Sequence, residues 1–197
     1  MTPSGTRSRE AFDRHAGAYD HWFAAHPRVY AEEVALLRRM LPHFSHGVEI
    51  GAGTGRMALP LGIPLGLEPA PAMGQIAHRR GMEVLKGVAE RLPFCGASFD
   101  LVLMATAISF FQDVPAAFAE VMRVLVPGGS LLLAFIDREG ELGRRYAAER
   151  RTSRFFGDAR FFSEAEVQAM LEGAGFLIAA IEGLECGYVA CRAEKWG

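Results

Sequence analysis

A glycine-rich turn is the first feature of the sequence whose residue types and spacing could do chemistry. The motif GAGTG (residues 51–55) joins the short apolar run 47–50 to a predicted helix. Glycines in such a turn allow positive φ angles and let a ligand touch the main chain. The helix that follows would point its free N–H groups and the positive end of its dipole at that ligand. The turn therefore predicts a binding site for a phosphate or a carboxylate.

Two glutamates near this turn narrow the choice of ligand. Glu68 ends the next predicted strand, where its carboxylate can accept hydrogen bonds from the two vicinal hydroxyls of a ribose. Glu49 precedes the glycines, where an acid would repel a pyrophosphate and suits a ligand that also carries positive charge, such as an amino acid with a sulfonium. The structural alternatives are a surface Glu68 beside a sharp turn, and a Glu49 bound to backbone N–H groups of its own loop.

Short apolar segments alternate with helical segments along the middle of the chain. Apolar runs without polar alternation are typical of strands that are covered on both faces. Residues 113–125 carry an apolar stripe at helical spacing, which begins near Asp113 and is stopped by the PGG motif (residues 127–129). The predicted strands are 47–50, 64–67, 82–85, 99–104 and 130–136, followed by a closing pair at 176–182 and 187–192.

This alternation predicts the fold, because strand–helix–strand units join through right-handed crossovers into a mainly parallel sheet. We predict an α/β fold with a doubly wound, mainly parallel seven-stranded sheet, Rossmann-like, with an antiparallel C-terminal strand. Residues 10–41 are expected to form two N-terminal helices broken near Pro27, and residues 1–9 to be frayed. Residues 137–160 are charged, and are expected to be helical or irregular. Ser163 and Glu166 have the spacing of a capping box that opens a late helix.

Composition and charge exclude several classes of protein. The 197 residues, half of them hydrophobic and 22% charged, suit a single domain 1–197 with its own core. A net charge of −2 provides no footprint for nucleic acid or for an acidic membrane surface. Cys95, Cys186 and Cys191 show no C-x-x-C spacing, so reduced thiols are expected and a metal site is not. No apolar run is long enough to span a bilayer, and a soluble, cytoplasmic protein is expected.

At this point the sequence resembles the class I S-adenosylmethionine-dependent methyltransferases, especially the small-molecule branch related to the ubiquinone and menaquinone C-methyltransferases. The stretch FDRHAGAYDHWF (residues 12–23) is similar to the helix that covers the cofactor in that branch. The resemblance implies the methyltransferase fold, S-adenosylmethionine as cofactor and methyl transfer to a small-molecule acceptor. Four ordered motifs carry it: VEIGAGTGR (48–56), GLEPA (66–70), KGVAERLPFCGASFDLVLMATAISFF (86–111) and VMRVLVPGGSLLLAF (121–135).

The resemblance also implies which residues bind the cofactor. The turn and the end of the fourth strand would hold the methionine part, under a residue from the N-terminal helix. The end of the second strand would hold the ribose, and the loop after the third strand would contact the adenine. The implied residues are Tyr19, Glu49, Gly51, Ala52, Gly53, Gly55, Ala105 and Thr106 for the first group, and Glu68, Pro69, Met73, Ala89 and Glu90 for the second.

Two positions qualify this assignment. Val88 stands where the family often has an acid or amide that accepts from the adenine amino group, so that contact is lost or supplied elsewhere. Glu90 is as well suited to fixing its loop as to binding. No catalytic residue is assigned, because a sulfonium already makes its methyl group electrophilic and the protein has chiefly to align the reactants and exclude water. His15 and His21 could reach the site, but a surface or packing role is favoured for both.

The acceptor is expected between the N-terminal helices and the segment after the fifth strand. The aromatic residues there are Phe110, Phe111, Tyr146, Phe155 and Phe156, for each of which core packing is the alternative. A basic run lies nearby and suits either an anionic acceptor or a solvated helix face; it comprises Arg144, Arg145, Arg150, Arg151 and Arg154. The sequence specifies neither the acceptor, nor the methylated atom, nor the oligomeric state.

Two other functions share part of this pattern. A nicotinamide-dependent oxidoreductase would use the same turn and Glu68, but Glu49, the PGG motif and the spacing GxGxG in place of GxGxxG argue against it. A non-catalytic domain that only binds S-adenosylmethionine is the other alternative, supported by the lack of a catalytic base and by Val88.

Overall fold

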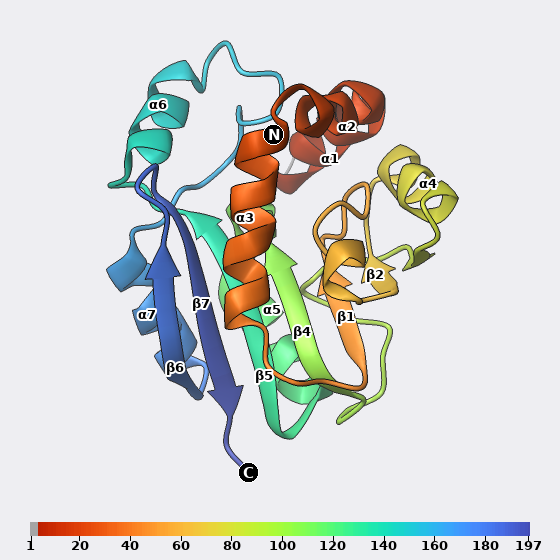
Figure 1. The fold of residues 1–197 in the computed structure, drawn as a ribbon, viewed down its shortest axis with the longest axis vertical. Coiled ribbons are helices and arrows are strands. Elements are labelled where there is room, and N and C mark those ends of the chain that lie inside the picture. Colours follow the sequence, from red (N-terminus) through yellow and green to blue (C-terminus); the bar gives the residue numbers. More distant parts are fainter. Residues whose placement is uncertain (1–3) are drawn as a thin grey trace.

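The computed structural model describes residues 4–197, and its centre is one seven-stranded sheet with the order β3-β2-β1-β4-β5-β7-β6. Strands β1 to β5 pair in parallel, whereas β7 is antiparallel to both β5 and β6 (Figure 1). The predicted fold class is therefore confirmed. The strands are β1 (Gly47–Ile50), β2 (Leu65–Leu67), β3 (Glu83–Leu85), β4 (Phe99–Ala105), β5 (Leu125–Ile136), β6 (Phe176–Gly183) and β7 (Tyr188–Lys195).

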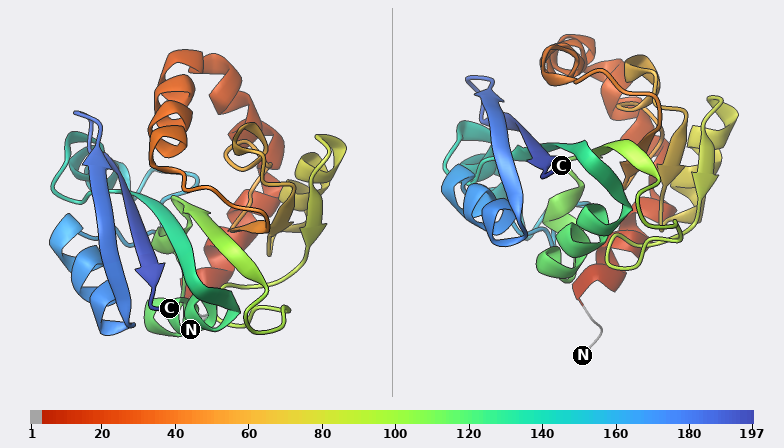
Figure 2. Two further views of the ribbon diagram at one scale, coloured as in Figure 1. Left: turned by 60° about the horizontal axis from the view of Figure 1, so that its bottom comes forward. Right: turned by 90° about the horizontal axis from the view of Figure 1, so that it is seen from below.

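Helices cover both faces of the sheet and one of its ends. Helix α3 lies on one face, and α5 and α7 lie on the other (Figure 2). Helices α1, α2 and α6 lie over the end of the sheet toward which the parallel strands run (Figure 1). The helices are α1 (Ser4–Arg14), α2 (Ala16–Ala25), α3 (Pro27–Met40), α4 (Pro71–Arg79), α5 (Val114–Val124), α6 (Glu141–Glu149) and α7 (Glu164–Gly173), with short 3-10 helices η1 (Leu59–Leu61) and η2 (Ala107–Phe110).

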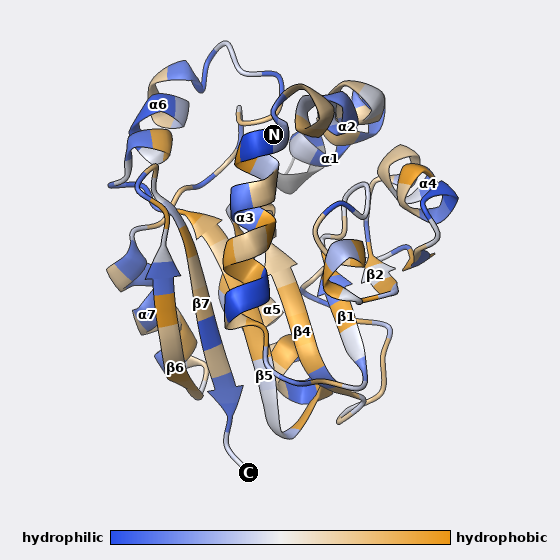
Figure 3. Cartoon of the chain, viewed as in Figure 1, coloured by the Kyte–Doolittle hydropathy of each residue, from blue (hydrophilic) through white to orange (hydrophobic). Residues whose placement is uncertain are grey.

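The central strands are apolar because both of their faces are buried (Figure 3). In β4, Val102 and Met104 contribute to the core under α5 and α7, while Leu101 and Leu103 contribute to the core under α3. The sheet order also creates a switch point, because the chain leaves β1 toward β2 on one side and β4 toward β5 on the other. In open α/β sheets, ligands bind at the carboxyl ends of strands at such a point.

Two predicted helix caps are confirmed. The Asp113 side chain accepts a hydrogen bond from the Ala116 amide at 3.0 Å at the start of α5. At the start of α7, Ser163 donates from its amide to Glu166 at 2.8 Å and accepts from the Glu166 amide at 3.3 Å. These short-range signals were readable because a cap involves only residues three apart.

The N-terminal region differs from the expectation. Helices α2 and α3 meet at Pro27 as predicted, but a further helix, α1, begins at Ser4 within the stretch 1–9 that was expected to be frayed. Residues 1–3 lie outside the described part of the chain. A polar segment gains helical order here from tertiary packing rather than from propensity, because Ser8 is buried and Asp13 binds the start of α4.

Within residues 4–197, no helix combines the length and apolarity that crossing a membrane requires.

Candidate functional site

The glycine turn follows β1 and has the backbone geometry that its glycines predict. Gly51, Gly53 and Gly55 have φ angles of 77°, 55° and 76°. The amide of Gly51 donates to the Leu67 carbonyl at 2.8 Å, which fixes the turn against the end of β2. A Cβ atom on Gly51 would lie 2.6 Å from the Cβ of Ala107. The main chain of the turn is therefore bare where it approaches η2.

The helix expected directly after this turn is absent, so that prediction is wrong. Residues 51–58 form turns, and only the 3-10 helix η1 follows before β2. Pro60 lies in η1 and Gly62 ends it with a φ of 80°, which leaves no room for a regular helix. A ligand at the turn would meet bare main chain, not the end of a helix dipole.

Glu68 lies at the mouth of the turn. One oxygen of its carboxylate accepts from the Gly53 amide at 2.8 Å, and the other accepts from the Ala70 amide at 2.8 Å. Its side chain is only 8% exposed, so the alternative of a surface glutamate is wrong. Burial raises the pKa of Glu68 to about 7, against the opposing effect of these two hydrogen bonds. Each oxygen retains further acceptor capacity toward the cleft.

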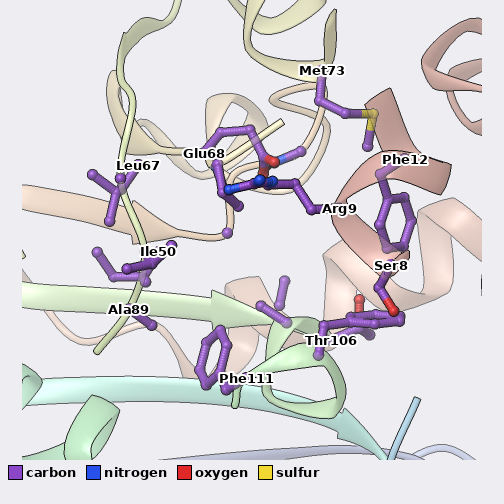
Figure 4. A pocket seen from close by; sticks show the side chains of 18 of the residues that line it. Ser8, Arg9, Phe12, Ile50, Leu67, Glu68, Met73, Ala89, Thr106 and Phe111 are labelled. Atoms are coloured by element: carbon purple, nitrogen blue, oxygen red, sulfur yellow. Dashed lines mark hydrogen bonds between the residues drawn. The ribbon is translucent and has the colours of Figure 1, made fainter. Parts of the chain in front are cut away.

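A cleft of about 920 Å³, including its open mouth, lies between this turn and the N-terminal helices. Figure 4 shows Leu67, Ile50 and Ala89 on one side of it, Phe12 and Ser8 of α1 on the other, and Glu68 between them. Ten of the thirteen predicted cofactor residues line it: Tyr19, Gly51, Gly53, Glu68, Pro69, Met73, Ala89, Glu90, Ala105 and Thr106.

The other three predicted residues support the cleft from behind. Glu49 is buried beneath the turn, and a hydrogen bond from the Ala58 backbone opposes the burial that raises its pKa well above the usual range. This agrees with the structural alternative, a carboxylate bound to its own loop. Ala52 is buried against β2, and Gly55 packs beside Ala77. None of the three belongs to the cleft wall.

Several lining residues were not predicted. Ser8, Arg9 and Phe12 come from α1, a polar helix that begins within the stretch expected to be frayed. Gly87 was passed over, although a Cβ there would lie 2.7 Å from Leu67 Cδ1. The remaining unpredicted lining residues lie beside predicted ones in the same loops: Ile50, Leu67, Val88, Ala107 and Gln112.

Ion pairs hold the N-terminal helices over the cleft. The Asp20 carboxylate of α2 accepts from the Arg56 guanidinium at 2.9 Å and from Arg80 at 3.0 Å. Burial works against the ionised Asp20, but the hydrogen bonds from Arg56 and the charge of Arg80 outweigh it and lower the pKa of Asp20 to about 2. On α1, the Asp13 carboxylate accepts a hydrogen bond from the Ala72 amide at 2.7 Å and so caps α4. The N-cap residue of α4 itself is Ala70, whose side chain cannot accept a hydrogen bond.

Aromatic rings close the cleft on the side of these helices. The Phe12 ring lies 5.5 Å from Tyr19, 4.9 Å from Phe110 and 5.2 Å from Phe155, measured between centroids. Burial and the neighbouring glutamates raise the pKa of Tyr19, so it stays a neutral phenol. Of the aromatic residues predicted for the acceptor pocket, Phe110 and Phe111 line the cleft, whereas Phe155, Phe156 and Tyr146 do not.

The comparisons with known proteins point to one family. A family model described as a methyltransferase domain matches residues 48–133. The malonyl-(acyl-carrier protein) O-methyltransferase of Geobacter sulfurreducens is 35% identical over 191 residues, which cover 85% of this chain and 69% of that protein. The chain belongs to the S-adenosylmethionine-dependent methyltransferases.

Two further relatives agree with this assignment. A Thermotoga maritima structure, described as a SAM-dependent methyltransferase and possible histamine N-methyltransferase, has a TM-score of 0.89 and 37% identity, covering 94% of this chain and 99% of that one. An uncharacterized protein of Methanocaldococcus jannaschii is 38% identical over 165 residues, 84% of this chain and 80% of that protein. The chain spans 61% of the length of mycobacterial relatives that it also matches at 38% identity.

The cleft of this methyltransferase fits S-adenosylmethionine. The bare glycine turn suits the amino-acid tail, and the buried Glu68 carboxylate suits the ribose hydroxyls. Leu67, Met73 and Ala89 give the cleft an apolar wall, which suits a flat base. The cofactor follows from the family as well as from this geometry. The oxidoreductase and the non-catalytic alternatives are not favoured.

Of the remaining polar candidates, only Glu90 lines the cleft of this methyltransferase. Glu90 belongs to its edge but accepts from the Gln112 amide at 2.7 Å, which fixes one loop to another. His15 packs edge-on to Phe155 at 6.4 Å, and His21 is exposed. All members of the basic run on and after α6 are exposed and none lines the cleft, as expected for a solvated face.

Proposed function

We propose that this enzyme transfers a methyl group from S-adenosylmethionine to a small-molecule acceptor. The observation that carries the proposal is the meeting of a bare glycine turn and a buried carboxylate at 2.8 Å, at the mouth of a cleft closed by α1 and α2. The acceptor would enter between those helices and η2, where Thr106 and Phe110 line the wall.

The bound cofactor supplies an electrophilic methyl group, and the chain supplies binding, alignment and the exclusion of water. The bare main chain at Gly51 and Gly53, whose own amides are bonded to Leu67 and Glu68, would let the methionine tail approach the turn closely, and the main chain at Ala105 would hold its amino group. Glu68 would receive the two ribose hydroxyls. The ring of Tyr19 would cover the reacting centre and keep bulk water from it.

The proposed acceptor is a small molecule of unspecified class. Relatives differ in what their names describe, since one is an O-methyltransferase of malonyl-(acyl-carrier protein) and another is a possible histamine N-methyltransferase. The resemblance to quinone C-methyltransferases therefore remains a prediction about the branch. The apolar rings of Phe110 and Phe111 favour an acceptor with a flat apolar part.

Calorimetry tests the cofactor directly. The full chain is titrated with S-adenosylhomocysteine and, separately, with NAD. We expect saturable one-site binding of S-adenosylhomocysteine and none of NAD, because the turn lacks a helix end to receive a pyrophosphate. Binding of NAD in place of S-adenosylhomocysteine would contradict the proposal.

A further inference from the structure

A second cavity lies beside the cofactor cleft and shares one wall with it. Both spaces are lined by Ser8, Phe110, Phe111 and Gln112, so they meet between α1 and the end of η2. The second cavity is completed by Ser109 of η2 and by Asp158 and Arg160 from the loop between α6 and α7. A molecule bound in the second cavity would therefore lie next to a ligand bound in the cofactor cleft.

The loop that closes this cavity is fastened to η2. The Arg160 amide donates to the Ser109 carbonyl at 2.9 Å. The Arg160 guanidinium donates to the carbonyl of Phe111 and, at 3.3 Å, to that of Gln112. These bonds attach the loop that contains Asp158 to the end of η2. The cavity is therefore a preformed feature of the fold.

Asp158 is the group in this cavity that lacks a partner. Its Oδ2 atom is buried, and no hydrogen-bond donor among residues 4–197 reaches it. A buried carboxylate oxygen without a donor is costly in free energy. Among the buried polar side-chain atoms of residues 4–197 that lack a partner, Asp158 Oδ2 is the one whose residue lines a cavity, so a molecule bound there could supply the donor.

The rest of the cavity indicates what carries that donor. The rings of Phe110 and Phe111 form its apolar side, and Phe110 is held edge-on by Phe12 at 4.9 Å. The hydroxyl-bearing Ser8 and Ser109 are 4% and 5% exposed and add small polar groups near the junction. A ligand with an apolar body and one hydrogen-bond donor would match the apolar and polar sides of this cavity.

We propose that this cavity is the acceptor subsite, and that Asp158 receives a hydrogen bond from an amine or hydroxyl group of an acceptor whose apolar body packs on Phe110 and Phe111. The proposal rests on the proposed function, since the subsite has meaning only beside a bound cofactor. Asp158 then determines which acceptors bind. It is not assigned a proton transfer.

The test uses three probes of similar shape: benzyl alcohol, benzylamine and ethylbenzene. Their dissociation constants are measured by ligand-observed NMR with the full chain saturated by S-adenosylhomocysteine. We expect the alcohol, the amine or both to bind about tenfold or more tightly than the hydrocarbon, as for a hydrogen bond to a charged acceptor. Asp158→Ala should abolish this preference, whereas Glu149→Ala, an exposed acid of neighbouring α6, should retain it.

The outcomes separate the subsite from the cofactor site. Loss of preference in Asp158→Ala with unchanged S-adenosylhomocysteine affinity supports the proposal, and preference for the amine over the alcohol identifies a cationic acceptor. Equal binding of all three probes, binding of none, or a preference that survives in Asp158→Ala overturns it. Failure of the wild-type chain to bind S-adenosylhomocysteine would instead contradict the proposed function.

A measurement of thermal stability shows whether Asp158→Ala loses its preference only because it is destabilised. Because the Asp158 carboxylate lacks a donor for Oδ2, Asp158→Ala should unfold at the same temperature as the wild type or higher. If Asp158→Ala is destabilised, Asp158→Asn is used in its place, because it keeps an acceptor oxygen but carries no charge. Asp158→Asn should still bind benzyl alcohol more tightly than ethylbenzene, and should no longer bind benzylamine more tightly than ethylbenzene. Retention of an amine preference in Asp158→Asn would overturn the assignment.

Discussion

Among single residues, three buried glutamates favour the folded state at low pH. Glu33, Glu49 and Glu68 are 8%, 1% and 8% exposed. Burial raises the pKa of Glu33 and of Glu68 to about 7 each, and it raises that of Glu49 well above its ordinary value. Each carboxyl group is therefore harder to ionise in the folded chain than in the unfolded one, so the folded state loses stability as pH rises.

Glu33→Gln tests this response away from the cofactor cleft. The pKa of Glu33 is raised from 4.5 to about 7 by burial alone, so its cost appears as pH rises from about 4.5 and is complete above about 7. The variant should be more stable than the wild type at pH 8, by up to about 3 kcal/mol, and similar to it near pH 4. Urea unfolding at both pH values measures this, with exposed Glu32→Gln as the control. A less stable Glu33→Gln at pH 8 would contradict the interpretation.

Gly51 and Gly62 form a matched pair for the glycine turn. Both have positive φ angles, 77° and 80°, but a Cβ on Gly51 would lie 2.6 Å from Ala107 while one on Gly62 meets nothing within 4 Å. Gly62→Ala should cost about 1–2 kcal/mol from its backbone conformation alone. Gly51→Ala should cost clearly more and weaken S-adenosylhomocysteine binding as well. Equal losses of stability would show that the close approach to η2 is unimportant.

At the scale of elements, the covering helices depend on a few polar contacts. Asp13 of α1 supplies the cap that α4 lacks. Asp13→Ala should therefore cost about 1 kcal/mol of stability, and it should weaken S-adenosylhomocysteine binding because α1 carries part of the cleft wall. Glu10→Ala, exposed on the same helix, is the control for both measurements. An unchanged affinity in Asp13→Ala would separate α1 from the cofactor site.

The elements also show what the sequence could and could not predict. Strands such as β4 were readable because burial on both faces leaves an uninterrupted apolar run. The caps at Asp113 and Ser163 were readable because they are local. The helix predicted after the glycine turn is absent, and residues 51–58 form turns that lead into the 3-10 helix η1. Helix α1 was missed because its order comes from contacts to α4, about sixty residues away.

The same distinction holds for the candidate site. Residues at the ends of β1, β2 and β4 were placed from motifs, and most of them line the cleft. Glu49 is buried beneath the turn, and its contact with the cofactor stays a prediction. The cavity with Asp158 could not be predicted at all, since it depends on where the loop after α6 meets η2.

At the scale of the whole molecule, the parallel pairing brings the carboxyl ends of β1, β2, β3 and β4 to the same end of the sheet. Helices α1 and α2 cover that end (Figure 1). Residues from many parts of the sequence then share one cleft, so the binding of cofactor should depend on the fold as a unit. Glu68 lies at its centre, between the glycine turn and α4. The account depends most on its carboxylate as the ribose acceptor.

The most direct measurement is calorimetry of S-adenosylhomocysteine with Glu68→Gln and the wild type from pH 6 to pH 8, with exposed Glu172→Gln as control. Wild-type affinity should rise with pH, because the pKa of Glu68 is about 7 and its ionised form is the better acceptor for hydroxyls. At pH 8, Glu68→Gln should bind roughly 10–100-fold more weakly and show little dependence on pH. A Glu68→Gln variant that binds S-adenosylhomocysteine as tightly as the wild type, with the same dependence on pH, would contradict the account.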